Sequence, residues 1–111
     1  MPVVAKNIIP AKFAENAQTT QYVATNVTTI IDKFTATNIS SGMVTLSVNL
    51  AAAGVAPGNA NLIVKAKTLQ AGETYTCPEV VGHILPSGGF ISTLASAAAA
   101  VNIRASGREI S

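Results

Sequence analysis

The 111-residue sequence is poor in charged and aromatic residues. Charged residues make up 11% of the chain, against roughly 25% in ordinary soluble domains. There is no Trp, and Phe and Tyr together account for 5%. Charges spread over a surface keep protein molecules apart in solution. A surface dominated by Thr, Ser, Asn and Ala is therefore typical of a subunit that packs against copies of itself; an extracellular-type β domain is the alternative interpretation.

Residues that usually carry catalysis are also scarce. Cys77 is the only cysteine, which excludes an intrachain disulfide, and we expect it to be a small buried hydrophobe. His83 is the only histidine, and Glu79 could reach it only across a helical turn, so a loop histidine is predicted. The remaining acidic residues are scattered singly, unlike a metal site or a two-carboxylate hydrolase: Glu15, Asp32, Glu73 and Glu109. We predict that the chain is not an enzyme and has no catalytic, cofactor-binding or metal site.

Further absences limit the expected partners. The net charge of +2 comes without a basic run, so nucleic-acid binding is not expected. No apolar run approaches the roughly 20 residues of a membrane helix, so no membrane partner is expected. The N-terminal segment lacks the layout of a signal peptide. We therefore expect a chain made in the cytoplasm that can still end in a particle.

Alternation of apolar and polar residues with a period of two is the main structural signal. Residues 44–50 predict a half-buried strand with Val44, Leu46, Val48 and Leu50 on one face. The same pattern places Leu62, Val64 and Ala66 on one face of a second strand, and Val101, Ile103 and Ala105 on one face of a third. The β-branched stretch 28–38 predicts a longer strand whose buried face carries Ile30, Phe34 and Ala36. Because Asp32 falls on the same face as these apolar residues, we expect either a bulge or a solvent-exposed strand end at the sheet edge there.

Turn residues separate these runs at near-regular spacing. Residues 38–42 predict a hairpin connection with a positive φ at Gly42, residues 54–61 a longer polar loop, and residues 86–89 a tight turn. Residues 94–100 are expected to be strand plus turn, although their Ala content also permits a helix. Residues 78–85 are either one helical turn or an irregular crossover.

Together these patterns predict an all-β fold: one antiparallel β-sandwich, jelly-roll or immunoglobulin-like, with about seven to eight strands. The expected domain covers residues 19–111. Residues 1–18 show no firm period and are either an N-terminal arm that reaches a neighbouring subunit or an edge strand.

Between Thr19 and Glu109 the sequence resembles small bacteriophage virion proteins encoded among head and tail structural genes. The segments that carry the resemblance are residues 29–38, 44–50, 71–78, 88–92 and 103–110. These segments are typical of β-sandwich strands and turns and include no catalytic motif. The resemblance implies a β-sandwich repeated around a symmetric particle, located in the virion and made in the host bacterial cytoplasm.

The expected function is a structural component of the neck, collar or tail. The implied partners are copies of the chain itself and other virion proteins: portal or connector, tail or capsid. A capsid decoration (cement) protein is the first alternative, and a receptor- or glycan-binding module is the second. We expect the loop 54–61 and the N-terminal arm to reach adjacent subunits.

Overall fold

The computed structural model describes residues 2–111; Met1, which belongs to the predicted arm, lies outside the described residues. Across that range the chain forms nine strands in two antiparallel sheets, and a short 3-10 turn, η1 (Asn59–Asn61). Sheet I contains β1 (Val3–Phe13), β9 (Val101–Ile110), β3 (Thr28–Asn38), β6 (Thr74–Tyr75) and β7 (Ile84–Leu85). Sheet II contains β2 (Thr19–Val23), β8 (Phe90–Ala95), β4 (Val44–Ala51) and β5 (Leu62–Leu69).

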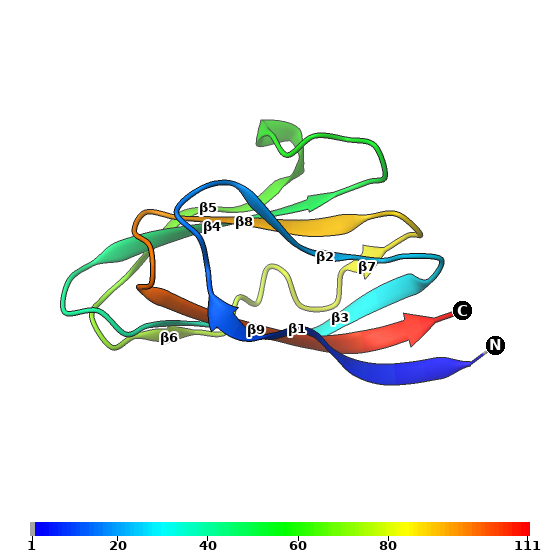
Figure 1. Cartoon of the computed structure of the whole chain (residues 1–111), viewed down its shortest axis with the longest axis horizontal. Helices are drawn as coiled ribbons and strands as arrows, with labels where there is room; N and C mark the ends of the chain where they lie inside the picture. The colour runs from blue at the N-terminus through cyan, green and yellow to red at the C-terminus, as the bar shows by residue number, and fades with distance from the viewer. Residues whose placement is uncertain (1) are drawn as a thin grey trace.

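The two sheets lie on one another as the layers of a sandwich (Figure 1). Sheet I has the order β1-β9-β3-β6, with β7 also paired to β3, and sheet II has the order β2-β8-β4-β5. The predicted all-β sandwich is confirmed. Strands number nine in the described chain, rather than seven to eight, because β6 and β7 are separate two-residue strands on the same edge of β3.

The core lies between the sheets and is built by the period-two faces of the long strands. Val101, Ile103 and Ala105 of β9 are all buried, as their alternation predicted. The largest fully buried apolar side chains come from both sheets and are Phe34, Ile9, Ile31, Leu46, Leu69, Ile91 and Ile103. Full burial of one such side chain stabilises the fold by about 1.5–3 kcal/mol.

A bulge in β3 shifts the predicted buried face. The register of β3 against β9 slips between Ile31 and Lys33, so that Asp32 is the extra residue and is exposed. Because one extra residue exchanges the two faces of a strand, Ile31 and not Ile30 is buried together with Phe34 and Ala36. The bulge that Asp32 indicated is confirmed, and the assignment of Ile30 to the core was wrong.

Irregular pairing changes the predicted face of β5, whereas the predicted buried face of β4 is correct. β4 pairs with β8 in unbroken register from Leu46 to Ala51, and half-buried Leu50 packs against the core, as predicted. Asn49 is also buried, because its side-chain amide donates to the Gly58 carbonyl and to Asn61 Oδ1. In β5, Ala66 has a φ of 46° and is exposed, because a bulge at this point breaks the alternation that began at Val64. A lone alternation pattern cannot reveal such an insertion, since it assumes unbroken pairing.

Turns and connections follow the predicted positions with one exception. Residues 38–42 link β3 of sheet I to β4 of sheet II, so they form a crossover between layers and not a hairpin, and Gly42 is not among the glycines with positive φ. The tight turn at residues 86–89 is confirmed: Gly88 has a φ of 87° and the Gly89 amide donates to the Pro86 carbonyl at 2.8 Å. Residues 94–100 are strand plus turn, since β8 ends at Ala95. Residues 78–82 are consecutive turns of an irregular crossover that leads through His83 into β7.

The first strand belongs to the sandwich. Of the two alternatives for residues 1–18, Val3–Phe13 forms an edge strand, paired antiparallel with β9. Ile8 and Ile9 are 4% and 0% exposed, and a register shift on either side of Ile9 lets both side chains enter the core.

Gly107 of β9 sits where the backbones of neighbouring strands come closest. A Cβ atom on this residue would lie 2.4 Å from the carbonyl oxygen of Ile30. We therefore expect Gly107→Ala to lower the free energy of unfolding by about 3 kcal/mol, since backbone must move to relieve the clash. Urea denaturation measures the change. Gly42→Ala is the matched control, with nothing within 4 Å of its new Cβ, and an equal loss in both variants would contradict the prediction.

Candidate functional site

The outer face of sheet I carries the best-defined depression on the described surface, with a volume of about 290 Å³. It lies across β1, β9 and β3, above a floor formed by Ala105 and Ser106. Its walls are polar and are formed by Asn7, Lys33, Thr35 and Arg104. These side chains project outward because their strands alternate, with Ile103 and Ala105 of β9 directed to the core.

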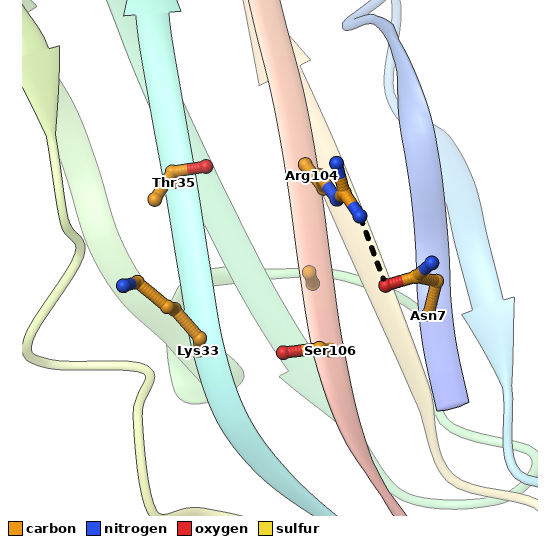
Figure 2. A pocket seen from close by; sticks show the side chains of 6 residues that line it. Asn7, Lys33, Thr35, Arg104 and Ser106 are labelled. Atoms are coloured by element: carbon orange, nitrogen blue, oxygen red, sulfur yellow. Dashed lines mark hydrogen bonds between the residues drawn. The ribbon is translucent and has the colours of Figure 1, made fainter. Parts of the chain in front are cut away.

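The charged groups of this depression do not converge on one point. Arg104 Nη2 donates to Asn7 Oδ1 at 3.4 Å, and Figure 2 shows the guanidinium reaching toward β1 while the Lys33 amino group points the opposite way. Between these two groups, the Thr35 hydroxyl on β3 points toward β9, and the Ser106 hydroxyl on β9 points toward β3. This arrangement offers hydrogen bonds to a polar partner, and it brings together no nucleophile and base.

Next to the depression, Arg108 and Asp32 form a two-pronged ion pair. Arg108 Nε lies 3.0 Å from Asp32 Oδ2, and Nη2 lies 2.9 Å from Oδ1. The hydrogen bonds from Arg108 hold the pKa of the Asp32 carboxyl below its ordinary value. The pair holds the extra residue of the β3 bulge against β9, and because it is exposed its contribution to stability is small.

A hydrogen-bond cluster joins the two sheets at the end where both chain termini lie. The Tyr22 hydroxyl, from β2, lies 2.5 Å from Glu109 Oε2 of β9 and 2.7 Å from Thr29 Oγ1 of β3. Lys6 Nζ approaches the same Glu109 oxygen at 3.4 Å. Burial, together with the hydrogen bond to Glu109, raises the pKa of Tyr22 to about 12. The cluster is therefore a polar contact that fixes β2 over sheet I.

Tyr22 makes stability sensitive to alkaline pH. The unfolded chain loses its tyrosine protons near pH 10, whereas folded Tyr22 keeps its proton to about pH 12. Its contribution is thus complete below pH 10 and is lost as pH rises from about 10 to 12. We expect the urea midpoint to fall over that window and to fall less in Tyr22→Phe, where Tyr75 and Cys77, each with a pKa raised to about 12, still contribute. An identical pH profile in both proteins would contradict this assignment.

The residues weighed from the sequence as catalytic candidates do not come together. Glu79 accepts a hydrogen bond from the Tyr75 hydroxyl, which lowers the pKa of the Glu79 carboxyl. The His83 side chain is exposed, and among residues 2–111 no hydrogen bond joins it to Glu79. Cys77 is fully buried, as predicted, and burial raises its thiol pKa to about 12.

Two features that mark broad classes of protein are absent from the described residues. In the part of the chain that the structure describes, no group of three or more His, Cys, Asp or Glu side chains is placed to hold a metal ion. Among the same residues, no helix is long and apolar enough to cross a membrane.

Comparisons with known proteins found no match: no family model, no curated protein and no solved structure is similar to this chain. The chain is therefore characterised by its fold and surface alone.

The position of Glu109 in the alternating pattern of β9 is a sequence signal for the inter-sheet cluster. The alternation that buries Val101, Ile103 and Ala105 continues through Gly107 to Glu109, which places this carboxylate on the core side of β9. A carboxylate in that position needs a partner, because burying it alone is costly. The identity of that partner, Tyr22, depends on how the sheets stack and could not be found from the sequence.

Proposed function

We propose that this chain is a non-enzymatic structural component of a bacteriophage particle, present in repeated copies in the neck, collar or tail. The observation that carries the proposal is a charge-poor sandwich that still exposes large apolar side chains on an uncovered edge. Val3 and Val4 of β1 are 56% and 54% exposed, and Phe13 is 42% exposed. Such a surface is a liability for an isolated monomer and suits a subunit that is covered by neighbours.

Repetition around a particle makes modest contacts sufficient. Symmetric assemblies use the same patch in every copy, and linked copies gain affinity by multivalency without new contacts. The polar outer face of sheet I fits the same role, since Arg104, Asn7 and Ser106 offer hydrogen bonds to a neighbouring subunit. A capsid decoration protein uses the same physical features, so it remains the alternative within this class.

The mass of the purified protein in solution tests the proposal. We expect light scattering after gel filtration to show a mass that exceeds one 11.3 kDa chain and rises with concentration. A ring of many copies favours a neck or tail component, and a dimer or trimer favours decoration. A monomer at every concentration, with no ordered assembly seen by electron microscopy, overturns the structural role.

A glycan-binding module is the second candidate, and the tyrosines bear on it. Sugars stack on exposed aromatic faces beside polar anchors. Here Lys67 Nζ already lies 4.9 Å from the centre of the Tyr75 ring, and the Tyr22 hydroxyl is engaged with Glu109. We expect no binding on a glycan array, and reproducible binding that Tyr75→Ala abolishes would favour this alternative.

A further inference from the structure

The sheet edges of the described sandwich differ in how well they are protected against pairing with another strand. β5 is protected against pairing with another strand by exposed Lys65 and Lys67 and by the bulge at Ala66. β2 spans five residues and its pairing shifts after Thr20, while β6 and β7 have two residues each. Short strands, bulges and lysines are the usual devices that block edge pairing.

β1 is protected over its second half only. Pro10 and Lys12 lie there, and its pairing with β9 is broken between Lys6 and Ile9 and again between Ile9 and Lys12. By contrast, residues 3–6 pair with β9 in unbroken register, from Val3 opposite Ile110 to Lys6 opposite Gly107. The first three of these residues are apolar, and Lys6 is paired with Glu109. Within residues 2–111 this segment is the one regular, mainly apolar stretch of edge strand with nothing paired to its outer side.

The direction of the free backbone groups follows from the register. The Ser111 amide donates to the Pro2 carbonyl at 3.2 Å, which makes Pro2 and Ser111 a hydrogen-bonded pair. Hydrogen-bonded and non-hydrogen-bonded pairs alternate along an antiparallel ladder. The backbone amide and carbonyl groups of Val4 and Lys6 therefore point toward β9. Val3 and Ala5 therefore direct their amide and carbonyl groups away from β9, to the open edge.

We propose that this open edge is a homodimer interface. The β1 strand of a second copy pairs with it in antiparallel orientation, about a two-fold axis at Val4. In this register Val3 lies opposite Ala5 of the second copy, and the two such pairs exchange about four backbone hydrogen bonds. Val4 lies opposite its own counterpart, with the Cα atoms about 4.5 Å apart. The exposed valines of both copies are thereby covered by apolar neighbours.

Charge disfavours the register shifted by one residue pair to a two-fold axis at Ala5, in which the two Lys6 side chains would be only two strand residues apart. With the axis at Val4, Lys6 falls opposite Pro2 of the second copy, and the two Lys6 side chains are four strand residues apart, about 13 Å. That separation exceeds the screening length of about 10 Å at 0.1 M salt, and each Lys6 is already paired with its own Glu109. The segment is therefore complementary to itself, which an unrelated acidic or basic strand is not.

The interface is small, and this sets its expected strength. Stable protein interfaces bury about 1,200–2,000 Å², more than a four-residue strand pair supplies. We expect association weaker than about 10 µM, which repetition on a particle would strengthen. The inference rests on the proposed structural role, whether in the neck and tail or as capsid decoration, and it adds that the building unit is a two-fold dimer, since an isologous contact closes at two copies. A ring then requires a second, different contact.

Backbone amide exchange of the full chain, measured by NMR at about 0.05 mM and about 2 mM, tests the interface. We expect exchange of the Val3 and Ala5 amides to slow by about two- to fivefold at the higher concentration, as mass action requires for a dissociation constant between about 1 mM and 10 µM. The Val4 and Lys6 amides, already bonded to β9, serve as the internal control and should change little. Equal exchange of Val3 and Ala5 at both concentrations overturns the interface.

Variants separate this inference from the structural role. Val3→Lys and Ala5→Pro should abolish the concentration dependence, and Val81→Lys, a matched change at an exposed valine away from β1, should leave it intact. Thermal unfolding confirms that each variant is folded. If mass rises with concentration while the Val3 and Ala5 amides do not respond, assembly uses another surface and the β1 interface is wrong. If mass never rises, the proposed function fails as well.

Discussion

Deletion of residues 1–17 is expected to unfold the protein. The segment contains Ile8 and Ile9, which are 4% and 0% exposed, and Ala14, which is also buried. The two isoleucines alone contribute about 3–6 kcal/mol through burial. Removal of β1 also leaves one edge of β9 unpaired and uncovers Ile103 and Ala105, which lie opposite Lys12 and Ile9. Because a domain of this size has a total stability of about 5–15 kcal/mol, little or none remains.

Far-UV circular dichroism and urea denaturation of the truncated chain test this expectation. Two point variants calibrate it: Ile9→Ala should lower the free energy of unfolding by about 2–5 kcal/mol, and Phe13→Ala, at a side chain that is 42% exposed, by about 1 kcal/mol or less. A truncated chain that keeps a cooperative transition would mean that β1 is a dispensable arm, as one interpretation of the sequence had it.

Alternation predicted those strands whose pairing is continuous. The face of β9 formed by Val101, Ile103 and Ala105 was correct, because its pairing with β3 is regular over that stretch. It failed where one strand gains a residue that its neighbour lacks, as at Asp32 in β3 and Ala66 in β5. The first bulge could be predicted because Asp32 places a charge within an otherwise apolar face. Nothing distinguished Ala66, because alanine fits either face.

The candidate site was less predictable than the fold, for a physical reason. The depression on sheet I combines Asn7, Lys33 and Arg104 from three strands that are distant in the sequence. Strand order brings them together, and the period-two pattern carries no information on strand order. The unprotected edge at residues 3–6 is a similar case. Its significance appears only once β9 is known to cover one side of β1 and nothing in the described chain covers the other.

Replacement of Asn38 by alanine is expected to lower the free energy of unfolding by about 3 kcal/mol. Asn38 is fully buried at the end of β3. Its amide nitrogen donates to the carbonyls of Gly42, Leu69 and Gln70 at 2.7, 3.0 and 3.1 Å. Its Oδ1 atom accepts from the Ser40 amide at 2.9 Å. The side chain thus joins sheet I to the end of β5 in sheet II.

The size of the effect follows from what alanine leaves behind. Each buried polar group that loses its partner costs about 1–3 kcal/mol, and several carbonyls lose theirs at once. Urea denaturation measures the loss, with Ser40→Ala as the control, because that change removes a hydroxyl and leaves the Asn38 amide bonds to the three carbonyls intact. Equal effects from Asn38→Ala and Ser40→Ala would mean that the turn and not the inter-sheet contact is stabilised.

Asn38→Asp distinguishes the hydrogen bonds from simple space filling, because aspartate has nearly the shape of asparagine. At neutral pH the carboxylate would direct negative charge at the carbonyl oxygens of Gly42, Leu69 and Gln70, which is unfavourable in a buried site. The protonated acid regains one donor. We therefore expect the variant to be less stable than Asn38→Ala at pH 7, and to recover relative to the wild type as pH falls toward 3. A variant as stable as the wild type at pH 7 would show that shape, and not donation to these carbonyls, holds the two sheets together at this end.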